Sequence, residues 1–156
     1  MAVVDKEAAS PELPIVLRPS NDDDVPAMLD IYRQHIAQGI GNLGAFEPAP
    51  FEADDLKARR KNMRKHKLPH LVATIDGAVA GYAYAVLFRK RPAYRFTVKH
   101  SIYVQSDRRN IGVGRALLPA LIEAASHSGA SINSVDISEA DLEAVFLHLT
   151  GTALRG

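Results

Sequence analysis

Candidate chemistry in this sequence is concentrated between Tyr103 and Arg115, in the run YVQSDRRNIGVGR. Gly112 and Gly114 stand one residue apart, directly before a strong helical pattern, so the main chain there can approach a ligand closely. The N-terminus of that helix supplies unpaired amides and a positive dipole end, which suit a phosphate group. Three arginines surround the segment: Arg108, Arg109 and Arg115. This combination favours a pyrophosphate site. An equally weighted alternative is that the two glycines are structural, the first for a turn and the second for close packing.

Other motifs that carry phosphate or redox chemistry are missing from the sequence. The dinucleotide pattern G-x-G-x-x-G is not met because position 117 is leucine, and no G-x-x-x-x-G-K-[ST] run occurs. Nucleotide hydrolysis and dinucleotide redox chemistry therefore have no support. The chain contains no cysteine, which excludes disulfides, thiolate catalysis and cysteine-based zinc sites, and we expect no metal.

The elements that position this segment follow from apolar periodicity and turn signals. An Asp76-Gly77 pair between two β-rich runs predicts an antiparallel hairpin. A helix over Val113–His127 follows the glycine pair, and its interior Pro119 predicts a kink or a later start. The expected elements are strands at Ile15–Arg18, Leu71–Ile75, Val79–Val86, Arg95–Val104 and Ile132–Ile137, and helices at Val25–Gln38, Glu52–His66, Val113–His127 and from Ser138 onward. This order predicts an α/β domain with a mixed central sheet flanked by helices.

The Glu52–His66 helix carries the run KARRKNMRKHK. Most of its basic residues fall on one broad face: Lys57, Arg60, Lys61, Arg64, Lys65 and Lys67. A phosphate or nucleic-acid patch is one interpretation. A solvated helix face is the favoured one, because charge runs usually face solvent and no aromatic residues interleave for base stacking. We therefore expect no nucleic-acid partner.

Composition bounds the class of protein. With 156 residues, 47% hydrophobic and 24% charged, the chain fits one ordinary soluble domain. Its 19 basic and 18 acidic side chains leave a net charge of +1, and this near-neutral balance does not favour a polyanionic partner such as a nucleic acid. The first 14 residues mix charges and lack the apolar run of a signal peptide, and no window is long enough for a membrane helix. We predict a cytoplasmic protein with no membrane partner.

The glycine segment resembles a known family. RNIGVG at Arg109–Gly114 matches the R/Q-x-x-G-x-G/A signature of the GNAT N-acetyltransferases. Four further runs resemble the branch that acetylates phosphinothricin and methionine sulfone: FEPAP, LVATIDGAVAGYAYA, RPAYRFTVKHSIYV and GRALLPALIEAA. The resemblance extends from about Ile15 to Ile137. It implies the GNAT fold, acetyl-CoA as cosubstrate, a small amine as acceptor, and a homodimer.

The resemblance also implies roles for particular residues. The main chain of Ile102, Tyr103 and Val104 would pair with the pantetheine amides of the cosubstrate. The pyrophosphate would lie against Arg109, Asn110, Ile111, Gly112, Val113, Gly114 and Arg115. The acceptor amine would lie against Phe46, the connection formed by Pro92, Ala93 and Tyr94, and the start of the long strand.

The catalytic base departs from the pattern of the branch. Where the branch reads T-V-E, with the glutamate as base, this sequence reads Thr97-Val98-Lys99. A lysine is a cation at pH 7 and would repel an ammonium substrate. His100 is a second candidate base, although strand alternation turns it to the face opposite Lys99. Glu47 is the third. A degenerate protein that binds CoA or acyl-CoA without turnover is therefore the alternative function.

The end of the chain departs as well. Relatives in the branch continue past the fifth strand with a helix and two further strands, whereas this sequence continues as EADLEAVFLHLTGTALRG. We expect a domain over residues 15–137 that lacks the last two strands. A disordered leader at 1–14 would precede it, and an atypical helix and tail at 138–156 would follow it.

Overall fold

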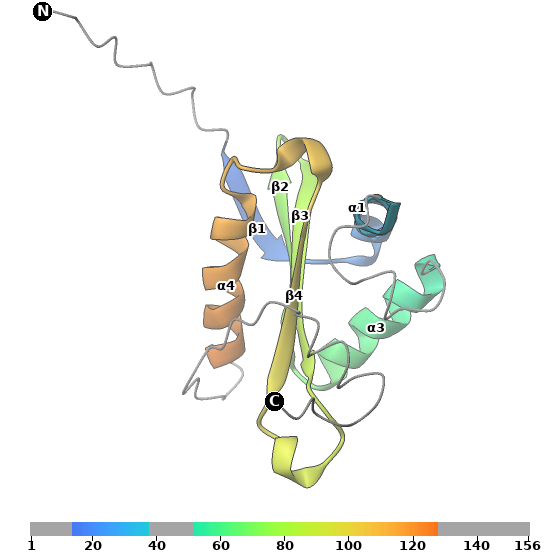
Figure 1. The fold of residues 1–156 in the computed structure, drawn as a ribbon, viewed down its shortest axis with the longest axis vertical. Coiled ribbons are helices and arrows are strands. Elements are labelled where there is room, and N and C mark those ends of the chain that lie inside the picture. Colours follow the sequence, from blue (N-terminus) through green and yellow to red (C-terminus); the bar gives the residue numbers. More distant parts are fainter. Residues whose placement is uncertain (1–13, 38–51, 128–156) are drawn as a thin grey trace, which may run out of the picture.

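The computed structural model describes residues 14–37 and 52–127, as a sheet with helices on both faces (Figure 1). The four described strands are all antiparallel neighbours, in the order β1-β2-β3-β4. They are β1 (Ile15–Pro19), β2 (His70–Ile75), β3 (Ala78–Leu87) and β4 (Val98–Val104). Helix α4 (Val113–His127) covers one face, while α1 (Val25–Ala37) and α3 (Ala53–Lys65) lie on the other (Figure 1). The α/β prediction is confirmed.

Each face of the sheet buries its own apolar cluster, because successive strand residues point to opposite faces. Under α1 and α3, Val72, Tyr82 and Tyr103 pack with Met28 and Met63. Under α4 the strands contribute small and branched residues, which pack against three helix residues one turn apart: Val113, Leu117 and Leu121. The predicted apolar stripe of this helix therefore faces the sheet.

The hairpin between β2 and β3 forms as predicted. Asp76 and Gly77 both have positive φ, 50° and 78°, and the strands pair from Ile75 with Ala78 onward. The connection between β3 and β4 differs from the prediction, because Arg95–Thr97 is not part of the strand. A short 3-10 turn, Pro92–Tyr94, is followed by the Thr97 amide donating to the Tyr94 carbonyl at 3.0 Å. The turn thus takes up the Thr97 amide, while the Thr97 carbonyl accepts from the Phe88 amide, directly after β3, at 3.0 Å.

The start of α1 is fixed by side chains that follow β1. Asn21 Oδ1 accepts from the Asp23 amide at 2.9 Å, and Asp24 Oδ2 accepts from the Asn21 amide at 2.8 Å. Arg18 of β1 holds both oxygens of the buried Asp24, at 2.7 and 2.8 Å. This pairing lowers the pKa of Asp24, with the Arg18 hydrogen bonds as the largest cause. The acidic stretch therefore joins strand and helix as well as capping the helix.

Pro119 lies inside α4, which begins at Val113. The expectation of a later helix start is wrong. Pro119 and Arg115 are both exposed, so the carbonyl that the missing amide would have bonded can reach solvent.

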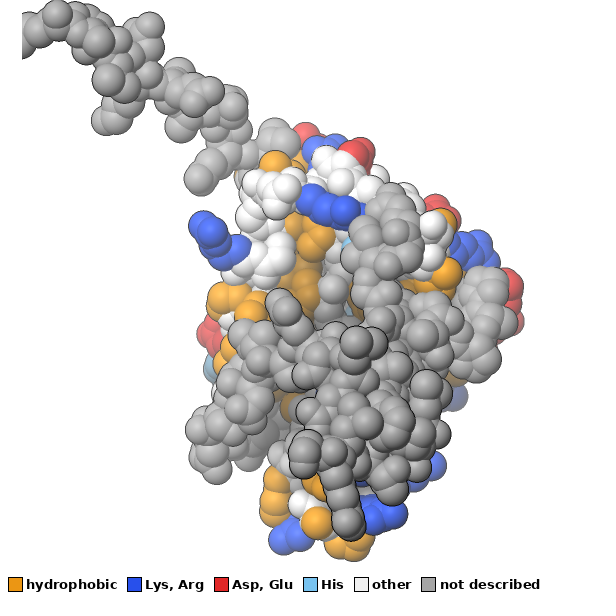
Figure 2. Space-filling view, in the orientation of Figure 1, with side chains coloured by type: hydrophobic (Ala, Val, Ile, Leu, Met, Phe, Trp, Pro, Cys, Tyr) orange, Lys and Arg blue, Asp and Glu red, His pale blue; other side chains and the backbone are white. Residues whose placement is uncertain are grey.

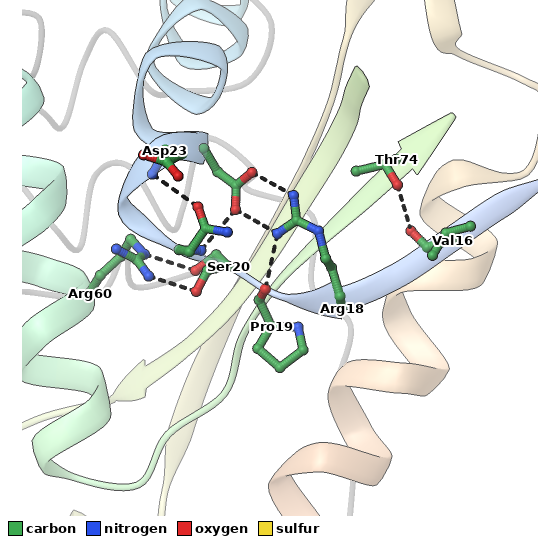
Figure 3. A network of polar contacts seen from close by, with 9 residues as sticks. Val16, Arg18, Pro19, Ser20, Asp23, Arg60 and Thr74 are labelled. Carbon is green, nitrogen blue, oxygen red and sulfur yellow. Dashed lines mark hydrogen bonds and ion pairs between the residues drawn. The ribbon is translucent and has the colours of Figure 1, made fainter. Parts of the chain in front are cut away.

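The basic helix α3 differs from the prediction at one residue. Arg60 is only 4% exposed, and its guanidinium is directed at the chain between β1 and α1 (Figure 3). Its Nε donates to Ser20 Oγ at 2.8 Å, its Nη2 to the Ser20 main-chain oxygen at 2.6 Å, and its Nη1 pairs with Asp22. The prediction of a solvated face is therefore wrong for Arg60. It holds for the other five residues of that face, which are exposed: Lys57, Lys61, Arg64, Lys65 and Lys67.

Several predicted segments lie outside the described residues. These are residues 1–13 of the leader, the loop with Phe46 and Glu47, the strand at 132–137 and the segment 138–156. The described sheet is antiparallel, so a mixed sheet would require a strand from these segments. None of the described helices is long and apolar enough to cross a membrane.

Candidate functional site

The predicted phosphate loop connects β4 to α4. After β4 the chain makes a 3-10 turn, Ser106–Arg108, and then takes positive φ at Asn110 (62°) and Gly112 (100°). The Ala116 amide donates to the Gly112 carbonyl at 2.9 Å, which opens the helix. The amides of the first helical turn have no partner within the helix, so they and the dipole end are available to an anion.

Most side chains of this loop leave the helix end accessible. Arg109, Asn110 and Arg115 are exposed, and Ile111 is 46% exposed. Val113 is 1% exposed and anchors the loop in the core under α4. Two cationic side chains therefore lie at a helix start with positive dipole, which is the arrangement that a pyrophosphate requires.

Gly81 of β3 lets the start of α4 lie directly on the sheet. A Cβ at this position would be 2.8 Å from both the Tyr103 main-chain oxygen and Val113 Cγ1. Gly114 is different, because a Cβ there would meet only Val104 Cγ2, at 3.9 Å. Close approach to the sheet thus depends on Gly81, which sequence analysis did not single out, while Gly114 leaves open space beside β4.

The main-chain groups of β4 are divided between its two edges. Each residue directs its amide and carbonyl toward one edge, and the next residue directs them toward the other. The Gln105 amide donates to the Ala80 carbonyl at 2.8 Å, so the main-chain groups of Tyr103 also face β3. Those of Ile102 and Val104 face the other edge, where no described strand lies. A ligand laid along this edge would therefore meet Ile102 and Val104 rather than Tyr103.

Two residues at the end of α1 hold the end of β4 in place, and sequence analysis missed both. His35 Nε2 lies 2.8 Å from the Val104 carbonyl oxygen, and because a carbonyl only accepts, Nε2 carries the proton. Gln34 Oε1 accepts from the Ser106 amide at 3.3 Å and from Ser106 Oγ at 3.1 Å. Sequence separations of 69 and 72 residues gave no local signal for these contacts.

Tyr103 is itself buried in a layer of aromatic rings on the α1 face. Its ring stacks on Tyr82 at 4.9 Å and meets Tyr32 and His35 edge-on at 5.8 and 5.6 Å. His70 extends this layer by stacking on Tyr84 at 5.4 Å. The layer gives the end of β4 a rigid support.

The predicted acceptor residues lie at the other end of β4. Pro92, Ala93 and Tyr94 form the tip of the β3–β4 connection, one strand length of about 20 Å from the loop. Figure 2 shows hydrophobic and basic side chains together at the lower end of the molecule, where Figure 1 places this tip. The Arg89 guanidinium lies 5.0 Å from the Phe88 ring centroid and 5.6 Å from that of Tyr94.

The candidate bases are not brought together. Lys99 pairs with Val86 and His100 with Ala85, so the two side chains alternate between the α1 face and the α4 face as predicted. Both are exposed. Glu47 lies outside the described residues. Within 14–37 and 52–127, no three His, Asp or Glu side chains are grouped to hold a metal ion.

These features define an α/β protein with a sheet edge leading into a glycine-containing loop and a helix start. The chain belongs to the acetyltransferase (GNAT) family, whose model matches residues 31–150. The recognised resemblance is thereby confirmed.

Named relatives fall in the expected branch. A phosphinothricin N-acetyltransferase from Alcaligenes faecalis is 42% identical over 106 residues, which cover 68% of this chain and 52% of the relative. An L-methionine sulfoximine/L-methionine sulfone acetyltransferase from Pseudomonas aeruginosa is 32% identical over 134 residues, or 85% of this chain and 76% of the relative. This chain thus spans about half the length of the first of these relatives.

A solved structure supports the fold. The crystal structure of a GNAT superfamily phosphinothricin acetyltransferase from Sinorhizobium meliloti, in complex with AcCoA, has a TM-score of 0.65 at 33% identity. The match covers 72% of this chain and 60% of that one.

Proposed function

We propose that this protein transfers the acetyl group of acetyl-CoA to the amine of a small amino-acid-like substrate, of the phosphinothricin or methionine sulfone type. One observation carries the proposal: the edge of β4 that no described strand covers runs into a loop with positive φ at Asn110 and Gly112, directly before α4. A cosubstrate with an amide-bearing arm and a pyrophosphate fits this continuous surface. The names of the relatives support the class of acceptor.

The chemistry demands little of the protein. The amine nitrogen attacks the acetyl carbon, a C–N bond forms, the C–S bond breaks, and the CoA thiolate leaves and takes up a proton. Position and a polarised carbonyl supply much of the rate, because the thioester is already activated. The amine has to be neutral when it attacks, so a base that removes its proton assists.

Position 99, where the branch has its catalytic glutamate, is a lysine in this chain and does not supply such a base. An ammonium group repels the protonated form of the substrate, so we expect slow turnover in the natural sequence. Lys99→Glu is expected to raise kcat/KM by about tenfold to a hundredfold with acetyl-CoA affinity unchanged. The conservative Lys99→Gln, which removes the charge without adding a base, is the control and should give a smaller increase.

Calorimetric titration with acetyl-CoA, followed by methionine sulfone, tests the proposal. Saturable binding and then heat of turnover support an acetyltransferase. Saturable binding without turnover, in Lys99→Glu as well as in the natural sequence, favours the degenerate CoA-binding alternative. Folded protein that binds no acetyl-CoA overturns both.

We also propose a homodimer and a cytoplasmic location. Exposed apolar side chains support the dimer, since four of the six large ones among the described residues gather at the β3–β4 tip: Leu87, Phe88, Phe96 and Val98. Phe96 is 86% exposed, which is unusual for a side chain left in water.

A further inference from the structure

A cavity of about 320 Å³ lies at the edge of the sheet formed by the ends of β1 and β2, between α3 and α4. We call it the α3–β2 cavity. Its lining includes Arg60, Arg64 and Lys67 from α3 and the turn after it, with Leu68, Leu71 and Ala124 as apolar wall. Ala124 lies about 16 Å along α4 from Val113, so the cavity is remote from the loop at the other end of that helix.

The lining is cationic. None of the described lining residues is acidic, and Arg60, Arg64 and Lys67 contribute three positive charges. Arg60 is buried and its charge is balanced by Asp22, while its guanidinium is held in place by Ser20 (Figure 3). Arg64 and Lys67 therefore leave a net positive field in the cavity.

Lys67 occupies a position that usually belongs to glycine. It lies two residues after the end of α3 with φ of 55°, where its amide donates to the Arg64 carbonyl at 3.0 Å and the Leu68 amide donates to the Met63 carbonyl at 2.9 Å. This is the left-handed cap of a helix, which a lysine adopts only at an energetic cost. A strained residue whose side chain lines a cavity points to a function for that side chain.

One lining residue, His70, carries a buried ring nitrogen, Nδ1, that lacks a hydrogen-bond partner among the described residues. Burial, followed by the charge of Arg60, lowers the pKa of His70 to about 4, so its ring is neutral at pH 7 and one nitrogen is a donor. Because Nδ1 is closed off from solvent, it takes no part in contacts within the cavity, and the cationic lining carries the site.

We propose that the α3–β2 cavity binds a small organic anion, a carboxylate or phosphate ester on a short apolar body, at a site separate from the acetyl-CoA loop. Arg64 and Lys67 bind the head group. Leu68, Leu71 and Ala124 contact the body of the ligand. The volume of the cavity is at the lower end for a small-molecule site.

The test compares three probes by calorimetry: hexanoate, hexyl phosphate and the neutral hexanamide. We expect saturable binding of one or both anions, with hexanamide weaker by at least about tenfold. The preferred anion distinguishes a carboxylate from a phosphate ligand. Equal affinity for hexanamide, or no anion binding at millimolar concentration, overturns the proposal.

Variants assign the binding to the cavity. Arg64→Gln with Lys67→Gln should weaken the anion by about tenfold or more. Lys61→Gln with Lys65→Gln removes the same charge from exposed positions of the same helix outside the cavity lining, and should change affinity less than about twofold. Equal losses in the two double variants would indicate a general charge effect. Loss only in Arg115→Gln would place the anion at the acetyl-CoA loop, and either result contradicts the proposal.

Discussion

The imidazole of His35, at the end of α1, donates a hydrogen bond to the main-chain oxygen of Val104, the last residue of β4, at 2.8 Å. The Val104 carbonyl faces the edge of the strand that the acetyl-CoA arm is proposed to follow. His35 therefore occupies the outward carbonyl of Val104, so the Val104 amide and the main-chain groups of Ile102 are the outward groups that the proposed arm would meet at this end of β4. It also fixes where β4 ends and the loop to α4 begins.

His35→Phe should loosen this end of β4 while preserving the ring contact with Tyr103. Loss of one hydrogen bond is expected to reduce the free energy of unfolding by about 1 kcal/mol and to raise the KM for acetyl-CoA several-fold. Thermal unfolding and steady-state kinetics measure the two effects. His127→Phe is the matched control, because His127 Nδ1 contacts the Glu123 main-chain oxygen at 2.8 Å at the far end of α4. An equal rise in KM for both variants would contradict the role of His35.

Gly81→Ala should displace the start of α4 from the sheet. The new Cβ would lie 2.8 Å from the Tyr103 oxygen and from Val113 Cγ1, so we expect a loss of about 1–3 kcal/mol in unfolding free energy and weaker acetyl-CoA binding. Gly114→Ala has room for its Cβ and should gain about 1 kcal/mol as a helical position. If Gly114→Ala nevertheless weakens acetyl-CoA binding, the open space beside Val104 belongs to the cosubstrate. Denaturant titration and calorimetry measure both variants.

Local patterns predict much of this fold, because they depend on neighbouring residues. The hairpin at Asp76-Gly77 needs only two residues that accept positive φ, and helix α4 needs only its apolar period and the glycine that precedes it. The antiparallel pairing of β2 with β3 and the loop between β4 and α4 follow from these signals.

Contacts between remote segments could not be predicted in this way. The sequence spacing of Arg60 places it on the basic face of α3, which was predicted to face solvent. In the structure its side chain is buried and hydrogen-bonded to Ser20, 40 residues earlier in the chain. Gln34 and His35 carry no motif and acquire their role only because α1 packs beside the end of β4. Gly81 is one more small residue in a strand until α4 lies on it. The role of each of these residues depends on tertiary packing rather than on local sequence.

Phe96→Ser tests the proposed dimer interface. Burial of a side chain of this size contributes about 1.5–3 kcal/mol, and a symmetric dimer loses it in both protomers, so the substitution should raise the dissociation constant of the dimer by at least about a hundredfold. Sedimentation equilibrium measures this constant. Val16→Ser, at a residue 56% exposed on β1, is the control and should leave association unchanged. A natural protein that sediments as a monomer, or a dimer insensitive to Phe96→Ser, would rule out this interface.

His70 and Asp24 should divide the acid unfolding of the protein into two pH ranges. The unfolded chain protonates His70 near pH 6.5, whereas in the folded protein its pKa is about 4, so the unfolded state binds more protons between these values. Stability therefore falls by about 3 kcal/mol as the pH is lowered from about 6.5 to 4. Asp24 has a lowered pKa through Arg18, so its contribution is present above about pH 3.9 and is lost as the pH falls through its folded value.

Urea unfolding at a series of pH values separates the two groups. His70→Phe keeps a ring against Tyr82 and Tyr84 and removes the titrating group, so the fall between pH 6.5 and 4 should largely disappear while the fall at lower pH remains. His66→Phe, the same change at an exposed histidine, should retain the full fall. Asp24→Asn should cost about 1–2 kcal/mol at pH 7, because it removes the charge that pairs with the partly exposed Arg18. Asp23→Asn, at an exposed position of the same turn, should cost little. Were His70→Phe to keep the dependence between pH 6.5 and 4, the assignment of that range to His70 would be wrong.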